Sequence, residues 1–196
     1  YIAAGYGVIP CLSAAREPLY SEPFSPDEVD EIITRYHRPY HMMLRDKLEA
    51  MLERSSHILL IDLHSMPDPA RQFGLKKVPA LRRALPDFIF GNLHGATLPP
   101  GLVKSIDAVM GTQNYSWSWN TPYAGGYTTR HYGMNYKKTD GKRVSVLQIE
   151  INRSLFLRLN GKAGDEEKAS GYLDSATLIS IASSLDRLIS TLEKTS

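Results

Sequence analysis

The pattern of apolar and polar residues predicts strands alternating with helices. Residues 57–63 form a short, nearly continuous apolar run, and residues 87–91 form a second. Short apolar runs beside helical or turn-rich segments are typical of buried strands in a parallel sheet. Residues 144–151 alternate instead, which predicts a strand with two different faces. One of these faces carries Val144, Val146, Gln148 and Glu150.

Three segments have the spacing of helices. Residues 25–28 (Ser-Pro-Asp-Glu) predict a helix start with a serine N-cap and a capping box, and apolar residues then recur at helical spacing over 29–52. Pro39 should bend this helix, because it lacks a backbone donor and crowds the preceding turn. A second helix is predicted over 100–110. A closing amphipathic helix is predicted over 173–192, and its apolar face comprises Leu178, Ile181, Leu185, Leu188, Ile189 and Leu192.

The remaining segments are rich in turn-forming residues. Residues 1–24 predict a loop or hairpin, and residues 114–133, rich in Trp, Tyr, Asn and Gly, predict a long surface loop of the kind that carries function. Alternating strands and helices predict an α/β fold with three layers: a mostly parallel, mixed sheet with helices on both faces. No linker or repeat divides the chain, so residues 1–196 are expected to form one domain.

Composition limits the classes of function. The 196 residues are enough for one α/β domain, and a net charge of +2 without a long basic face argues against nucleic-acid and membrane partners. Cys11 is the single cysteine, so no internal disulfide forms. With no export signal visible, the sequence predicts a cytoplasmic protein. The chain begins at Tyr1 rather than Met, in what reads as strand and turn sequence, and we expect a natural N-terminal segment before it.

The first candidate site lies where the apolar run 57–63 ends. Asp62 and His64 are two residues apart, so on an extended strand they point the same way. The carboxyl edge of a parallel sheet is where such folds bind ligands. An imidazole is a favoured zinc ligand, and a nearby carboxylate fixes its tautomer. The alternative is a satisfied core histidine beside a polar strand end.

A second candidate site lies on the alternating strand. Gln148 and Glu150 share one face, while the other face is apolar. A buried carboxylate needs a cation, a bound water or a raised pKa, and each of these suits a general base. The alternative is a structural salt bridge between Glu150 and Arg153.

The third candidate is the segment from Asn120 to Gly133. Its paired glycines allow a backbone to approach a ligand closely. Arg130 offers the planar fork that binds a carboxylate. Tyr123 and Tyr132 are able to close a pocket and donate a hydroxyl group. The alternative is a flexible aromatic loop without a ligand.

Four motifs in this order resemble the N-formylglutamate amidohydrolase family. The resemblance covers about residues 18–156, and that family is similar in fold to the zinc carboxypeptidases. The four motifs are Tyr36-His37-Arg38-Pro39-Tyr40-His41, Ile61-Asp62-Leu63-His64-Ser65-Met66-Pro67, the run Asn120-Thr121-Pro122-Tyr123-Ala124-Gly125-Gly126-Tyr127-Thr128-Thr129-Arg130-His131-Tyr132-Gly133, and Leu147-Gln148-Ile149-Glu150-Ile151-Asn152-Arg153.

The resemblance implies a zinc site with three protein ligands. His64 is one of them, and the other two, a histidine and a carboxylate, belong to an N-terminal family segment that this sequence lacks. The resemblance also implies that Glu150 is the acid/base carboxylate. Asp62 and Gln148 are expected to support His64 and Glu150 without contacting the substrate. A further departure is Asn92, which stands where the family usually has Asp.

Substrate contacts are implied for a second group of residues. Arg130 is the best candidate for holding the substrate carboxylate, with Arg153 and Arg71 as alternatives. Tyr123 and Asn120 are expected to contact the substrate from the same loop. The implied substrate is a small N-acyl amino acid, N-formylglutamate, which is hydrolysed to formate and glutamate. Oligomeric state is not predicted.

Three other interpretations stay open. The chain could be a zinc peptidase or another N-acyl-amino-acid deacylase on the same scaffold, since the fold alone does not determine the substrate. It could be a metal-free binding module. Finally, all the polar signals could be structural, which requires Asp62, His64, Gln148 and Glu150 to lie apart in space.

Overall fold

The computed structural model describes residues 7–12, 17–68, 85–135, 141–160 and 170–195. They belong to two compact units, Tyr1–Arg54 and Ser55–Ser196, and each unit is described by itself. The expectation of a single domain over 1–196 stays a prediction. Within the described ranges, no helix has both the length and the apolar character that a membrane span requires.

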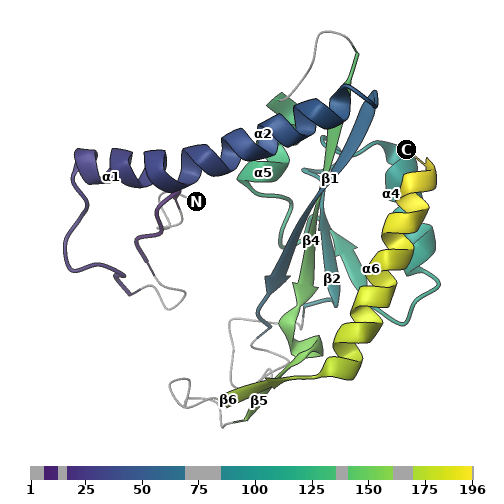
Figure 1. Ribbon diagram of the computed structural model, residues 1–196. Coiled ribbons are helices and arrows are strands. Elements are labelled where there is room, and N and C mark those ends of the chain that lie inside the picture. Colours follow the sequence, from purple (N-terminus) through teal and green to yellow (C-terminus); the bar gives the residue numbers. More distant parts are fainter. Residues whose placement is uncertain (1–6, 13–16, 69–84, 136–140, 161–169, 196) are drawn as a thin grey trace. The chain divides into compact units, whose positions relative to one another are not determined.

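The first unit is dominated by one helical segment (Figure 1). It comprises α1 (Pro26–Ile32), the π-helical turn η2 (Ile33–His37) and α2 (Arg38–Leu52). The predicted capping box at its start is confirmed: the Ser25 hydroxyl accepts from the Glu28 amide at 3.3 Å, and the Ser25 amide donates to the Glu28 carboxylate at 2.8 Å. Ahead of Pro39 the hydrogen-bond pattern changes to the wider π form, so the helix adjusts without ending.

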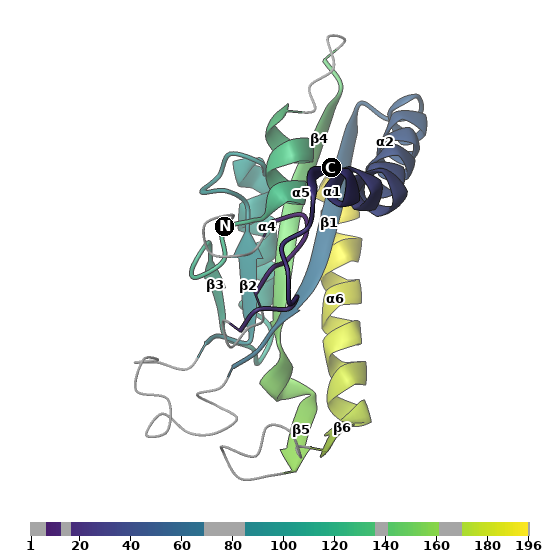
Figure 2. The ribbon, with the colours of Figure 1, turned by 90° about the vertical axis from the view of Figure 1, so that its left-hand side faces the viewer.

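The second unit contains a four-stranded mixed sheet (Figures 1 and 2). Its strands are β1 (His57–Met66), β2 (Phe88–Gly91), β3 (Trp117–Trp119) and β4 (Arg143–Asn152), in the spatial order β1-β4-β2-β3. β1 is parallel to β4, and β2 is parallel to β3, while β2 and β4 are antiparallel. The predicted α/β fold with a mostly parallel, mixed sheet is therefore confirmed.

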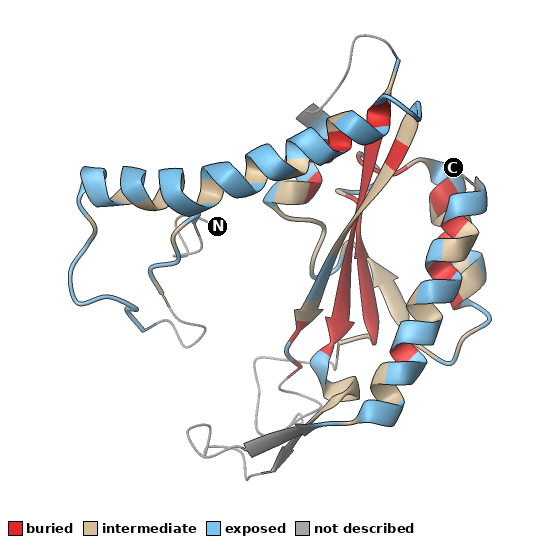
Figure 3. Ribbon diagram, viewed as in Figure 1, coloured by how far each residue is buried: buried red, intermediate tan, exposed pale blue. Residues whose placement is uncertain are grey.

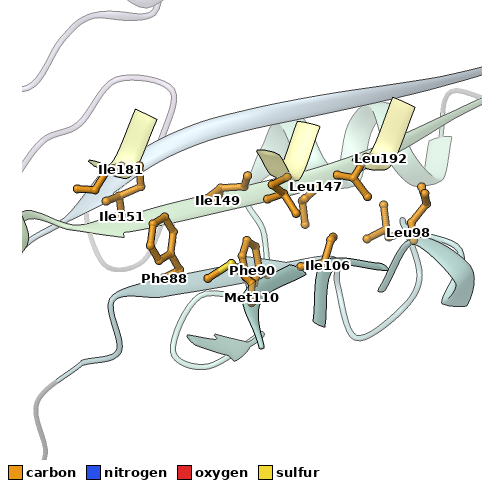
Figure 4. Packing of buried hydrophobic residues seen from close by; sticks show 12 residues of the cluster. Phe88, Phe90, Leu98, Ile106, Met110, Leu147, Ile149, Ile151, Ile181 and Leu192 are labelled. Atoms are coloured by element: carbon orange, nitrogen blue, oxygen red, sulfur yellow. The ribbon is translucent and has the colours of Figure 1, made fainter. Parts of the chain in front are cut away.

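The apolar core lies on one face of this sheet, under the helices α4 (Pro100–Met110) and α6 (Ser175–Thr195). Figure 4 shows side chains of β2 and β4 packing against side chains of both helices. The helix predicted over 100–110 has the bounds that were expected. The buried members of the core are Phe88, Phe90, Leu98, Leu102, Ile106, Met110, Leu147, Ile149, Ile151, Ile181, Leu188 and Leu192.

The opposite face carries the short helix α5 (Tyr127–Arg130) and the π-helical turn η4 (His131–Asn135). Gly133 of η4 lies so close to Thr97 that an added Cβ would come within 2.6 Å of the threonine side chain. The close approach needs a glycine, and it holds η4 against the sheet. Helices thus cover both faces, as the sequence predicts.

Several predictions about individual segments are wrong. β1 is an edge strand of the described sheet and is only partly buried (Figure 3). Leu63 on this strand is 56% exposed. Residues 114–133 are not a continuous loop, because they contain β3 and α5. The closing helix begins at Ser175, because Leu173 ends a strand, and Ile189 of its expected apolar face is 39% exposed.

A small hairpin precedes the closing helix. It consists of β5 (Leu157–Asn160) and β6 (Ser170–Leu173), which pair antiparallel after the 3-10 turn η5 (Arg153–Leu155). The sequence does not predict this hairpin, because four-residue strands give too short a pattern to distinguish from loop.

Candidate active site at the ends of two parallel strands

The register between β1 and β4 places the two central motifs side by side. Asp62 lies opposite Gln148, and His64 lies opposite Glu150. Neighbouring strands are about 4.8 Å apart, and paired residues of a parallel ladder direct their side chains to the same face. The four polar side chains therefore form one cluster, on the face that does not carry the apolar core. The interpretation that required them to lie apart is excluded.

His64 is fixed by its neighbour on the same strand. Its Nε2 lies 2.9 Å from an oxygen of Asp62, and the two side chains are 48% and 19% exposed. A histidine that is half exposed is not a core residue, so the structural alternative for His64 fails. Because Asp62 occupies Nε2, the other ring nitrogen, Nδ1, is the atom left for a ligand.

Glu150 is the most perturbed carboxyl of the cluster. It is 8% exposed, and the Gln148 side-chain amide donates to its Oε1 at 3.0 Å. Burial raises the pKa of Glu150, because it penalises the charged form, and Asp62 adds to this increase. His64, the Gln148 hydrogen bond and Arg153 act in the opposite direction without cancelling it. A carboxyl with a raised pKa suits proton transfer.

Arg153 does not form the salt bridge that was the alternative role for Glu150. Among the ion pairs of the described residues, none joins Arg153 to Glu150. The Arg153 guanidinium instead donates to Ser65, to the hydroxyl at 3.1 Å and to the backbone carbonyl at 3.2 Å. Arg153 thus ties the end of β4 to the end of β1. Its contact with substrate stays a prediction.

The strand end also contains a buried polar contact that the sequence analysis missed. The Asn152 side chain donates to Asp68 at 2.8 Å, and both residues are fully buried. The Asn152 side-chain oxygen accepts from the Ser154 backbone amide at 3.0 Å, which caps the turn η5. The contact fixes the turn from which Arg153 extends. The only sequence signal for the contact between Asn152 and Asp68 was the asparagine directly before Arg153 in the motif.

The paired glycines of the 120–133 segment contact other residues of this chain. Gly125 has a φ of 127° and lies against Thr129. The Gly126 amide donates to the Gln148 side-chain carbonyl at 2.8 Å. Arg130, at the end of α5, is exposed and makes no side-chain hydrogen bond or ion pair within the described ranges. Tyr123 is half-buried, and its contact with substrate stays a prediction.

Asn120 has an internal role that its place in the motif did not reveal. Its side-chain oxygen accepts from the amides of Asn92 and His94 at 3.0 and 3.1 Å. These bonds hold the turn after β2, where Leu93 and His94 both have positive φ values. Such residues cost free energy unless neighbours fix them. The expected substrate contact of Asn120 stays a prediction.

Asn92 fits this turn as an internal acceptor. Its side-chain oxygen receives the Gly95 amide at 2.8 Å and the Asn120 side-chain amide at 2.9 Å. An aspartate, the residue the family usually has here, would accept the same two bonds. The departure at position 92 is therefore compatible with the local structure.

The cluster supplies only part of the ligand set that a metal site needs. His64 offers one ring nitrogen, but the part of the chain that the structure describes contains no group of three His, Cys, Asp or Glu side chains arranged for one ion. A zinc site needs three protein ligands and one open position. Arg71, the third candidate for binding the substrate carboxylate, lies outside the described residues.

The fold and the cluster together define an α/β protein with a group of polar side chains near the ends of two parallel strands. Comparison with known proteins extends this result. The model of the N-formylglutamate amidohydrolase family matches residues 1–157, so the chain belongs to that family. The resemblance drawn from the four motifs is confirmed.

Individual relatives agree with this assignment. The chain is 30% identical over 161 residues to an N-formylglutamate deformylase of Pseudomonas putida, covering 80% of this chain and 55% of the relative. A second deformylase, from Pseudomonas aeruginosa, is 28% identical, with coverage of 80% and 56%. The crystal structure of an N-formylglutamate amidohydrolase from Ralstonia eutropha JMP134 matches with a TM-score of 0.65 and 32% identity, covering 80% of this chain and 53% of that one. The chain thus spans about half the length of these relatives.

Proposed function

We propose that this chain carries part of the active site of a hydrolase that cleaves the amide bond of an N-acyl amino acid. The proposed substrate is N-formylglutamate, and the products are formate and glutamate. The observation that supports this most directly is the register of β1 and β4, which brings His64 and Glu150 together on one face. Membership of the N-formylglutamate amidohydrolase family supports the choice of substrate.

Glu150 is the proposed acid/base residue. Its Oε1 is occupied by Gln148, while Oε2 makes no hydrogen bond with the described residues. In the reaction, Oε2 takes a proton from the attacking water and gives it to the leaving nitrogen. The raised pKa supports this role, because it makes the carboxylate a stronger base toward the water proton.

His64 is the proposed ligand of a zinc ion or another divalent metal. Asp62 holds Nε2, which leaves Nδ1 as the donor atom. Further ligands would have to come from outside the described residues, since these do not complete a set of three. When bound, such an ion lowers the pKa of a water molecule and polarises the amide carbonyl.

Arg130 is the proposed group that binds the substrate carboxylate. Its guanidinium is exposed and has no partner in the described parts of the chain, whereas Arg153 is engaged with Ser65. A bidentate pair between arginine and carboxylate fixes orientation as well as charge. Tyr123 and Asn120 lie on the loop that leads to α5, so they remain candidates for lesser contacts.

The test is a substrate panel assayed on the full-length gene product with measured metal content. Formate release from N-formylglutamate, faster than deacylation of N-acetyl or N-succinyl amino acids, would support the proposal. Preferred cleavage of another member of the panel, or of dipeptides, would instead support the deacylase or peptidase alternatives. No turnover with any member, in protein without bound metal, would support the binding module.

A further inference from the structure

Gln148 links two parts of the site that lie on different elements. Its side-chain carbonyl accepts from the Gly126 amide at 2.8 Å, and its side-chain amide donates to Glu150 Oε1 at 3.0 Å. Thr129 adds a longer contact of 3.5 Å to the same carbonyl. Gln148 itself is buried, with 6% of its surface exposed.

These contacts allow only one orientation of the Gln148 amide. A backbone N–H only donates, so the Gln148 oxygen must face Gly126. The nitrogen must then face Glu150, where it is able only to donate. Oε1 of Glu150 is therefore an acceptor in this structure, and Oε2 is the oxygen left to exchange a proton. The orientation of Gln148 thus decides which carboxylate oxygen of Glu150 is available.

The same contacts continue toward the proposed substrate-binding arginine. Gly126 is the N-cap residue of α5, and its carbonyl accepts from the Arg130 backbone amide at 3.2 Å. Hydrogen bonds therefore connect the Glu150 carboxylate, through Gln148 and Gly126, to the backbone of Arg130. Glu150 and Gln148 lie on β4 and Arg130 lies on α5, so the bonds connect two regular elements.

We propose that Gln148 is a positioning residue that holds Glu150 in register with α5 and therefore with Arg130. The inference rests on the proposed function, because it assumes that Glu150 transfers the proton. Gln148 contacts Glu150 at Oε1 and not at Oε2, the oxygen proposed to exchange the proton. It acts by fixing the plane of the Glu150 carboxylate and the distance between the proton-transfer group and the group that binds substrate. A small error in such a distance slows a reaction strongly, since catalysis depends on geometry.

Two substitutions of Gln148 separate positioning from simple packing. Gln148→Met keeps the volume but loses both hydrogen bonds. Gln148→Glu keeps an acceptor for Gly126 but is unable to donate to an ionised Glu150. If Gln148 positions Glu150, both variants of the full-length gene product should lose about 10- to 100-fold in kcat at pH 8, with KM for N-formylglutamate changed by less than about threefold.

Gln113→Met is the matched control. Both polar atoms of the Gln113 side chain are buried without a hydrogen-bond partner among the described residues, so methionine removes no hydrogen bond to them. Its kcat should equal that of the unsubstituted protein. The inference is overturned if Gln148→Met or Gln148→Glu keeps normal kcat, or if Gln148→Met lowers only the melting temperature. An unsubstituted protein without hydrolase activity would instead reject the proposed function.

Discussion

The two faces of β4 use the same backbone for different purposes. One face carries Leu147, Ile149 and Ile151, which are buried under α4 and α6. The other carries Gln148 and Glu150, which are almost as well buried but polar. The apolar face needs only volume and shape. The polar face needs a specific partner for each group, because an unpaired buried polar group costs free energy.

The difference between the two faces shows that the Glu150 carboxylate is placed less favourably for stability than its neighbours on β4. Gln148 has a partner at each end, whereas the Glu150 carboxylate receives one hydrogen bond from the described residues and has its pKa raised by burial. A buried carboxylate without a direct ion pair weakens the fold at neutral pH. Such a cost is expected where the group has a chemical role.

His64→Ala is expected to have a larger effect than the substitutions of Ile149, Arg130 and Arg153. Loss of the imidazole should remove the proposed metal ligand and reduce kcat/KM for N-formylglutamate by more than about 100-fold. The side chain is half exposed, so the melting temperature of the metal-free protein should change little. Metal analysis and steady-state kinetics check this. Normal metal content together with normal kcat/KM would remove His64 from the site.

Ile149→Ala tests the apolar face between the two polar residues. Ile149 is fully buried, so truncation should lower the free energy of unfolding by about 2–5 kcal/mol through lost transfer energy and a cavity. The kcat of the protein that remains folded should be nearly normal. Denaturant unfolding and kinetics below the transition measure both. A large loss of kcat without loss of stability would contradict the separation of the two faces.

Arg130→Ala and Arg153→Ala compare the two candidate cations. A charged hydrogen bond contributes about 1.5–3 kcal/mol, so Arg130→Ala should raise KM by about 10- to 100-fold. Arg153→Ala removes the link to Ser65 and should reduce stability more than KM. Kinetics with N-formylglutamate distinguish them. The reverse result would assign the substrate carboxylate to Arg153.

The smallest effect is expected in the pH dependence of stability. Because the pKa of Glu150 in the folded protein lies above its ordinary value of 4.5, the stabilising contribution is fully present below about pH 4.5 and is lost as the pH rises through the raised pKa. Glu150→Gln should therefore be more stable than the unsubstituted protein at pH 7, with the difference vanishing at low pH. Melting temperatures from pH 4 to 8 measure this. A variant that is less stable at pH 7 would show that the carboxylate is favourably paired.

Much of this arrangement follows from local sequence. The capping box at Ser25, the helix over 100–110 and the alternating strand around Glu150 were predicted, because each depends on residues close together in the chain. The shared face of Asp62 and His64 follows in the same way from the period of a strand. The proximity of His64 and Glu150 was expected from family resemblance together with this period, and their functional roles stay predictions.

Other features depend on partners that the sequence does not identify. The role of Asn120 depends on a turn 26 to 28 residues earlier in the chain. The hydrogen bond from the Gly126 amide to the Gln148 side chain joins residues 22 positions apart. Trp117 and Trp119 read as loop residues, but both indole N–H groups donate to one oxygen of Asp107 on α4, which holds β3 in place. The exposure of β1 depends on strand order, which local periodicity does not determine.

The central claim is that Glu150 transfers a proton beside a metal-binding His64, and the substitution Glu150→Gln tests it most directly. Asp107→Asn is the matched control, since it makes the same change of a carboxylate to an amide on the apolar side of the sheet. The account predicts that Glu150→Gln retains the metal content of the full-length gene product while kcat falls by about 10²- to 10⁴-fold, and that Asp107→Asn keeps normal kcat. A kcat for Glu150→Gln close to that of the unsubstituted enzyme would contradict the account.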